Sequence, residues 1–180
     1  MSEAIVRPPN PEFKGYIHTD GGQAMQQIRV SETSRQLQLK IQYFLTDVAA
    51  PNSGNFTLMP GSHLRPYPEE GLAEGPHAPG AVQLCVEAGD AALFGHSLWH
   101  GVAPNLSHQS RKTLIYCYSQ HCFRPFDYQQ PSDALLARCT PRQRRLLGDL
   151  GQDWRPGAYF YSPKDQIELV MGAQEETDTG

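Results

Sequence analysis

The fold is indicated most directly by one stretch of sequence, Leu37-Gln38-Leu39-Lys40-Ile41-Gln42-Tyr43-Phe44-Leu45. Large apolar side chains stand at its odd positions, and most of its even positions are polar. A period of two is typical of a β-strand that presents two different faces. A cluster of turn-forming residues over 49–55 then ends the pattern. The sequence therefore predicts a strand over 37–45.

Shorter segments of the same kind occur on both sides of this strand. Strands are expected at 26–30, 56–59, 81–86, 91–95 and 111–120, with turns rich in Gly and Pro between them. Helical patterns come late: one begins at Ser132, and a second covers 141–147 and is stopped by Gly148. Many short strands followed by a few helices favour a β-sandwich or jelly roll over alternating βαβ units. We expect a mainly β fold with a jelly-roll core and short C-terminal helices.

The length of 180 residues suggests a single domain. Within 1–180 we expect an extended lead-in over 1–12, a core over 13–124, a helical extension over 125–170 and a disordered tail over 171–180. The segment 64–80, rich in Pro, Gly and Glu, is longer than an ordinary connection. It is either a functional loop or a mobile one, and we expect substrate selection to take place there.

The amino-acid composition limits the kinds of binding partner that we expect. The chain has 19 acidic and 15 basic residues and a net charge of -4, so no nucleic-acid partner is expected. The cluster of Arg142, Arg144 and Arg145 is interpreted as the solvated face of a helix. No apolar stretch is long enough to span a membrane, and the N-terminus lacks the pattern of a signal peptide. The four cysteines have no metal-module spacing, which predicts a reduced, cytoplasmic protein.

A possible metal site lies in the motif His18-Thr19-Asp20. Residues i and i+2 of an extended strand point to the same face, so the imidazole and the carboxylate can converge on one ion. His100, which follows the strand at 91–95, is the best candidate for a third ligand. Two histidines and one carboxylate with open coordination positions form the facial triad of non-heme Fe(II) sites. The alternative is a His and an Asp that are merely hydrogen-bonded in a turn.

His96 competes with His100 for the role of ligand. The two are spaced i, i+4, as in zinc proteases, and a zinc hydrolase could use His96, His100 and Asp20. However, Gly95 and Pro104 restrict any helix here, which favours a structural or supporting role for His96.

Arg111 opens the last expected strand. A buried guanidinium needs an anionic partner, and its planar fork matches a carboxylate in a bidentate way. Thr113 points to the same face and can add a hydroxyl donor. The alternative is an exposed arginine at the end of a strand.

Taken together, these motifs resemble the phytanoyl-CoA dioxygenase family of Fe(II)/2-oxoglutarate oxygenases, over residues 13–124. The resemblance is carried by several elements in family order: His18-Thr19-Asp20, Gly54, Pro60-Gly61-Ser62-His63, Gly89-Asp90, Trp99-His100-Gly101 and Arg111. It implies a double-stranded β-helix core that holds Fe(II) through His18, Asp20 and His100.

The resemblance also implies how the cosubstrate binds. 2-Oxoglutarate would chelate the iron through its C1 carboxylate and keto oxygen, and its far carboxylate would pair with Arg111 and Thr113. Tyr43 aligns best with an aromatic residue that often lies against the cosubstrate in such families, although Lys40 and Gln42 point to the opposite face. The implied reaction consumes O2, converts 2-oxoglutarate to succinate and CO2, and hydroxylates a small-molecule substrate.

The sequence departs from the family pattern before His18. Only 17 residues precede it, where family members usually have a long helical region, and this leaves open a shortened member or a fragment. The retained Asp20 argues for hydroxylation rather than halogenation, while desaturation and related outcomes stay open. The rival interpretation is a cupin-like jelly roll that binds metal without oxygenase activity.

Overall fold

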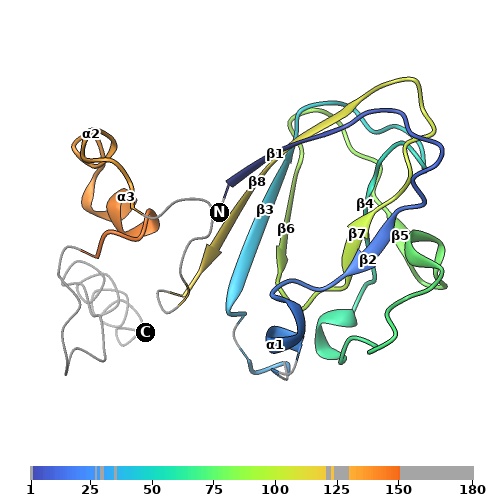
Figure 1. The fold of residues 1–180 in the computed structure, drawn as a ribbon, viewed down its shortest axis with the longest axis horizontal. Coiled ribbons are helices and arrows are strands. Elements are labelled where there is room, and N and C mark those ends of the chain that lie inside the picture. Colours follow the sequence, from blue (N-terminus) through green and yellow to red (C-terminus); the bar gives the residue numbers. More distant parts are fainter. Residues whose placement is uncertain are drawn as a thin grey trace, which may run out of the picture. The chain divides into compact units, whose positions relative to one another are not determined.

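The computed structural model describes residues 2–26, 28, 31–34, 36–120, 123 and 130–150. The chain divides into two compact units, Met1–Asp127 and Tyr128–Gly180, which are described separately. The first is the β unit, whose strands are labelled in Figure 1. The second contains the described C-terminal helices.

The β unit consists of two antiparallel four-stranded sheets. The larger sheet has the order β1 (Ser2–Arg7), β8 (Arg111–Ser119), β3 (Gln38–Phe44) and β6 (Ala91–Gly95). The smaller sheet has the order β2 (Tyr16–His18), β7 (His100–Val102), β4 (Phe56–Leu58) and β5 (Val82–Gln83). Eight antiparallel strands divided in this way between two sheets form a jelly roll. The predicted fold class is confirmed.

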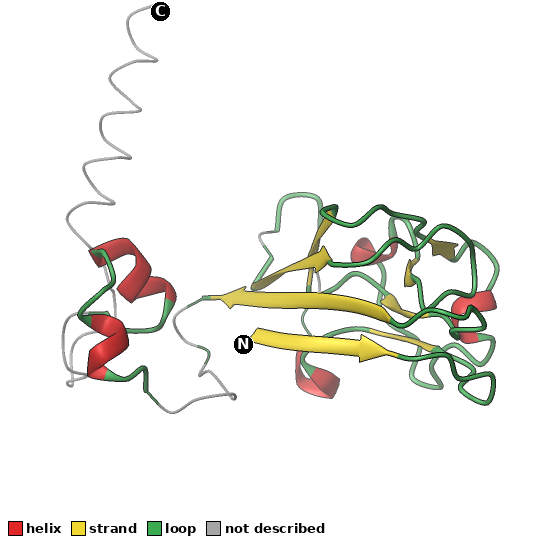
Figure 2. Cartoon of the chain, turned by 90° about the horizontal axis from the view of Figure 1, so that it is seen from above, coloured by secondary structure: helices red, strands yellow, loops and turns green. Residues whose placement is uncertain are grey.

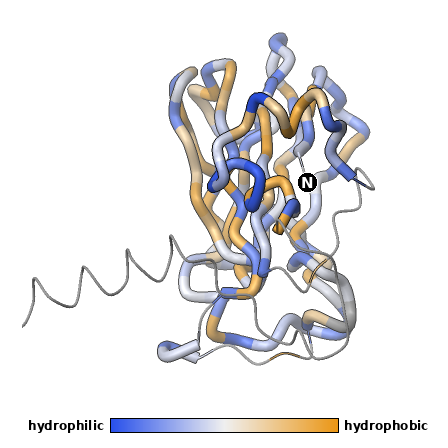
Figure 3. Tube along the Cα trace, turned by 90° about the vertical axis from the view of Figure 1, so that its left-hand side faces the viewer, coloured by the Kyte–Doolittle hydropathy of each residue, from blue (hydrophilic) through white to orange (hydrophobic). Residues whose placement is uncertain are grey.

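Two clusters of buried side chains hold the β unit together. Phe44 from the larger sheet packs with Phe56 of the smaller sheet and with Phe94 and Val48. Ile17, Met59 and Trp99 form a second cluster. Along the tube in Figure 3, orange hydrophobic stretches follow the strands and several turns are blue. Both clusters lie close to the ends of strands that carry the candidate site residues.

Strand β3 is present as predicted, but its buried face is the more polar one. The side chain of Gln42 is 3% exposed, whereas Leu39 and Tyr43 are 42% and 38% exposed. Tyr43 lies edge-on against Tyr116 of the neighbouring strand, with ring centroids 6.1 Å apart. The strand therefore turns Lys40 and Gln42 inward, toward a cavity.

Strand β1 falls within the segment expected to be an extended lead-in. It pairs with β8 along its whole length, from Ser2 opposite Tyr116 to Arg7 opposite Arg111. Figure 2 shows this N-terminal strand running antiparallel beside the longest strand. The core therefore begins before residue 13, and β1 contributes Arg7 to it.

Several other boundaries differ from the expectations. The strand predicted over 26–30 is wrong at its start, because Gln26 ends the short helix α1 (Gly22–Gln26). The long loop over 64–80 begins at the last residue of one 3-10 turn, η1 (Ser62–Leu64), and contains all of a second, η2 (Gly75–His77). The strand expected over 81–86 is only Val82–Gln83.

The second unit contains the two predicted helices, α2 (Asp133–Leu136) and α3 (Pro141–Leu146). Ser132 caps α2 by accepting a hydrogen bond from the Leu135 amide, and Thr140 and Gln143 form a capping box on α3. Gly148 has a φ of 87°, which suits the end of a helix. The tail expected over 171–180 lies outside the described residues. Among the described residues, no helix is long and apolar enough to cross a membrane.

Candidate metal centre

The pairing of β2 with β7 brings the two predicted histidine ligands together. His18 is the last residue of β2 and His100 is the first residue of β7, and they are direct partners in the antiparallel register. Their ring centroids are 4.5 Å apart. Residues far apart in the sequence therefore meet at one end of two adjacent strands of the smaller sheet.

Asp20 lies in the turn that follows β2, and its backbone amide donates a 3.1 Å hydrogen bond to the His96 carbonyl. Its Oδ1 is 3.7 Å from Nε2 of His18, and its Oδ2 is 3.7 Å from Nε2 of His100. One donor atom from each of the three residues lies within 4.8 Å of the others. Across the described part of the chain, this is the one group of three or more such side chains that could share an ion.

The electrostatic state of these groups fits a bound cation. The Nδ1 of His100 donates a 2.8 Å hydrogen bond to the Leu98 carbonyl, which leaves Nε2 directed at Asp20 with a lone pair. Burial lowers the pKa of His100 to about 4, so its imidazole is neutral near pH 7. Burial raises the pKa of the Asp20 carboxyl, but His18, His100 and Lys40 outweigh it and hold that pKa at about 2. The buried Oδ2 of Asp20 has no hydrogen-bond partner, which is the state expected of an oxygen that binds a metal.

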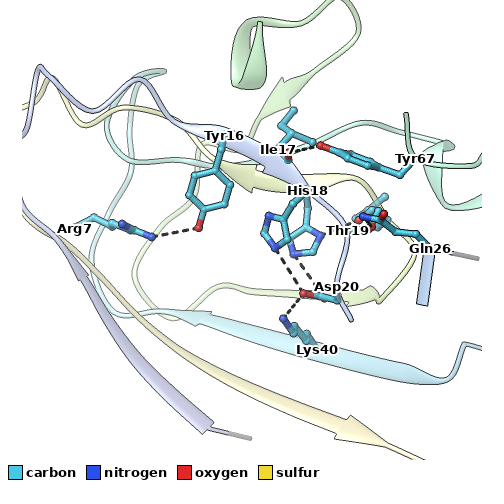
Figure 4. A network of polar contacts seen from close by, with 11 residues as sticks. Arg7, Tyr16, Ile17, His18, Thr19, Asp20, Gln26, Lys40 and Tyr67 are labelled. Carbon is cyan, nitrogen blue, oxygen red and sulfur yellow. Dashed lines mark hydrogen bonds and ion pairs between the residues drawn. The ribbon is translucent and has the colours of Figure 1, made fainter. Parts of the chain in front are cut away.

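Lys40 is a functional-site residue that sequence reasoning did not assign. Its ammonium donates to Asp20 with Nζ 2.6 Å from Oδ1, as Figure 4 shows. The available signal was the alternation along β3, which places Lys40 and Gln42 on one face. Because this face of β3 lines the candidate site, the Lys40 ammonium reaches the Asp20 carboxylate.

Arg111 opens β8 and lies in a small cavity of about 120 Å³ that also borders His18, His100 and Lys40. Its side chain is 4% exposed, its Nη1 donates a weak 3.4 Å bond to the Thr113 hydroxyl, and its Nε has no partner. No carboxylate of the described residues forms an ion pair with it. Burial and the neighbouring Arg7 guanidinium lower the pKa of Arg111 to about 10, so it stays cationic near pH 7. The cavity thus offers an anion-binding group beside the metal ligands.

Arg7 is the second residue that the sequence did not reveal. It lies directly opposite Arg111 in the β1–β8 pair and lines the same cavity. Its guanidinium lies over the Phe13 ring and donates a long 3.5 Å bond to the Tyr16 hydroxyl. Like charges on opposite residues of paired strands are unfavourable without an anion between them. The sequence does not predict that Arg7 lies opposite Arg111, because strand β1 is not expected from its pattern.

Tyr43 lies away from the cavity beside Arg111, so the structure gives no support to its expected contact with a cosubstrate. It points to the outer face of the larger sheet, whereas its neighbours Lys40 and Gln42 line the cavity. The physical reason is the period of two: residues 42 and 43 must face opposite sides.

A second, larger cavity of about 460 Å³ borders Asp20 on the side of the 64–80 loop. Its lining includes Gln26, His63, Arg65, Tyr67, His96 and Ser97. His96 is 2% exposed and neither of its ring nitrogens has a hydrogen-bond partner. It is not part of the group that could share an ion with Asp20. The zinc-hydrolase ligand set is therefore not the one assembled here.

Solved structures share this fold. The apo form of HygX from Streptomyces hygroscopicus matches with a TM-score of 0.55 and 20% identity, over 68% of this chain and 57% of that chain. HygX with nickel and 2-oxoglutarate bound matches with a TM-score of 0.53 and 19% identity, over 66% of this chain and 55% of that chain. Identities this low establish a likeness of fold.

Sequence comparison gives the family. Dioxygenase cdmA from Talaromyces verruculosus is 28% identical over 113 residues, which are 59% of this chain and 33% of that protein. The chain thus spans about one third of the length of this curated relative. The sequence profile described as Phytanoyl-CoA dioxygenase (PhyH) matches residues 2–113, which cover most of the β unit. The chain belongs to the phytanoyl-CoA dioxygenase family.

Proposed function

We propose that this protein is an Fe(II)/2-oxoglutarate-dependent dioxygenase that hydroxylates a small-molecule substrate. The family uses Fe(II), 2-oxoglutarate and O2, and the donor set of His18, Asp20 and His100 fits Fe(II). The observation that carries the proposal is the direct pairing of His18 with His100, with Asp20 between their Nε2 atoms.

His18, Asp20 and His100 would hold the iron on one side and leave its other positions open. When bound, the iron would activate O2 in a reaction that converts 2-oxoglutarate to succinate and CO2 and delivers an oxygen atom to a substrate C–H bond. Arg111 and Thr113 would bind the far carboxylate of 2-oxoglutarate, since the buried guanidinium has no carboxylate partner within the described structure. The protein would supply positioning and charge, with the cosubstrate in the cavity beside Arg111 and the substrate in the larger cavity that borders Asp20.

The larger cavity supports a small-molecule substrate. Its volume of about 460 Å³ lies in the range of small-ligand sites. The unpartnered imidazole of His96 and the Arg65 and His63 side chains offer polar contacts within it. HygX has also been solved with nickel, 2-oxoglutarate and hygromycin B bound. We also propose a cytoplasmic location, because the spacing of the four cysteines suggests no disulfide framework.

The contact between Lys40 and Asp20 favours one competing function, a jelly roll without oxygenase activity. In that case the ammonium would be a permanent substitute for a metal, and the cavity beside Arg111 would serve another anion. The two functions differ in whether Fe(II) displaces Lys40 from the carboxylate.

Anaerobic titration with Fe(II) and 2-oxoglutarate, followed by assay of succinate after O2 is admitted, tests the proposal. The wild type should bind one Fe(II) and show a visible charge-transfer band with 2-oxoglutarate. His18→Ala and His100→Ala should lose the metal, and Arg111→Ala should bind metal but lose affinity for 2-oxoglutarate. Arg142→Ala, on the exposed helix α3, is the matched control and should behave as the wild type. Retention of the metal by His18→Ala would refute the ligand set.

A further inference from the structure

We propose that Lys40 makes metal binding depend on the dianionic cosubstrate, because its ammonium occupies the ligand carboxylate in the metal-free protein. The inference rests on the proposed function and extends it to the order in which the site is filled. It is carried by the Lys40–Asp20 contact and by the charges that surround the adjoining cavity.

The contact is close and largely shielded from solvent. The Nζ of Lys40 lies 2.6 Å from Oδ1 of Asp20, and the two side chains are 14% and 8% exposed. Figure 4 shows the ammonium on the larger sheet facing the carboxylate that follows β2. Asp20 Oδ1 lies 3.7 Å from His18 Nε2, and the unpartnered Oδ2 lies 3.7 Å from His100 Nε2. A divalent ion between the two histidines would therefore share the single negative charge of this carboxylate with the ammonium and be repelled by it.

The surroundings of this pair are rich in positive charge. The cavity between the histidines and Arg111 is lined by three cationic side chains, Lys40, Arg7 and Arg111. Among the described residues that line this cavity, Glu3 is the only acidic one, and Asp20 lies next to the lining through its contact with Lys40. Entry of a divalent metal by itself adds two positive charges where cations already predominate. Repulsion between partly buried charges is weakly screened, so the metal should bind poorly alone.

A dianion in the same cavity reverses this balance. 2-Oxoglutarate brings two carboxylates, and the ammonium released from Asp20 lies on the wall of the cavity that would receive them. Metal and cosubstrate should therefore strengthen each other's binding by the same factor, as linkage requires. Chelation of the metal by 2-oxoglutarate contributes to this coupling in any case. The part due to Lys40 is the difference between variants with and without the ammonium.

The test is the dissociation constant of Mn(II), measured by the EPR signal of the free ion, with and without 2-oxoglutarate. Lys40→Met keeps the length of the side chain and removes its charge. It should bind Mn(II) alone about tenfold more tightly than the wild type, and its coupling factor with 2-oxoglutarate should fall by a similar amount. Lys112→Met, at an exposed position of β8, is the matched control and should change neither quantity.

Equal or weaker Mn(II) binding by Lys40→Met would overturn the inference and make Lys40 a structural partner of Asp20. Lys40→Gln provides a second neutral variant if Lys40→Met fails to fold, and it carries the same expectations. A wild type that shows no coupling between Mn(II) and 2-oxoglutarate would also overturn it. These outcomes differ from failure of the proposed function, in which Asp20→Ala would bind Mn(II) as well as the wild type does.

Discussion

At the scale of single residues, Arg111 carries a charge that the described part of the fold leaves without a counter-ion. Its side chain is 4% exposed, and among the described residues its one side-chain hydrogen bond goes to the Thr113 hydroxyl. An isolated buried charge destabilises a fold unless a partner arrives with the ligand. The residue is thus better explained by binding than by stability.

We therefore expect Arg111→Met to raise the free energy of unfolding of the ligand-free protein by about 1–4 kcal/mol, because it replaces an unpaired charge with an apolar side chain of similar length. Urea unfolding measures this change. The same variant should lose the stabilisation that 2-oxoglutarate gives to the metal-loaded wild type. A large loss of stability would instead mean that the guanidinium has a structural partner.

The buried imidazole of His100 predicts a dependence of stability on pH. Its pKa is lowered from 6.5 to about 4, chiefly by burial. The folded state therefore binds fewer protons than the unfolded state between these values. Stability of the metal-free protein is full above pH 6.5 and is lost as the pH falls toward 4, by about 3 kcal/mol from this group.

Denaturant unfolding of the metal-free protein between pH 7 and pH 4 checks this expectation. His100→Gln should flatten the profile over that interval, because glutamine does not titrate. An unchanged slope in the variant would show that other groups cause the acid sensitivity.

At the scale of elements, the contact between β2 and β7 depends on one glycine. Gly101 lies opposite Ile17, and a Cβ atom at this position would collide with the backbone carbonyl of Tyr16. The carbonyl cannot move without separating the two strands. The distance between His18 and His100 therefore depends on the absence of a side chain between them.

Gly101→Ala should weaken metal binding and lower the free energy of unfolding by about 1–3 kcal/mol, because the added methyl group forces the paired strands apart. Calorimetric titration with Mn(II) and urea unfolding measure the two effects. Gly89→Ala is the control: Gly89 has a φ of 103° in open space, so the variant is strained but leaves the pairing intact. If both variants lose metal equally, general destabilisation is the cause.

The strands also show how much of the fold the sequence alone predicts. Alternation located β3, β6 and β8, because long strands repeat the pattern often enough to be recognised. It does not reveal β2 and β7, because they have only three residues each. It does not reveal β1 either, whose paired strand β8 lies far away in the sequence. Alternation does not tell which face of β3 is buried, so it cannot show that Lys40 and Gln42, and not Tyr43, line the cavity. The candidate triad could be predicted because its residues belong to motifs, whereas the positions of Lys40 and Arg7 beside it depend on strand pairing.

At the scale of the whole molecule, the site connects the two sheets. His18 and His100 belong to the smaller sheet, and Lys40 and Arg111 to the larger one. A metal and a dianion bound together would link both sheets through one set of contacts. Ligands that bind only the folded state stabilise it in proportion to the logarithm of their concentration.

Mn(II) and 2-oxoglutarate together should raise the free energy of unfolding by about 2.7 kcal/mol at concentrations one hundred times the dissociation constant. Thermal unfolding with and without the ligands measures the increase, and a chelator should reverse it. His18→Ala should show no increase under the same conditions. A shift in that variant equal to the wild type's would place the binding elsewhere.

The outward-facing apolar side chains of β3 have a practical consequence for the design of variants of this protein. The apolar residues Leu39 and Tyr43 on the outer face, together with Leu93 on β6, which is 69% exposed, are open to replacement by charged side chains. The polar residues between them, Lys40 and Gln42, are not, since they line the cavity beside Arg111. A mutagenesis library guided by hydropathy would keep the outward-facing apolar residues and change the polar residues that line the cavity. Positions should instead be chosen by the face of the strand to which each side chain points.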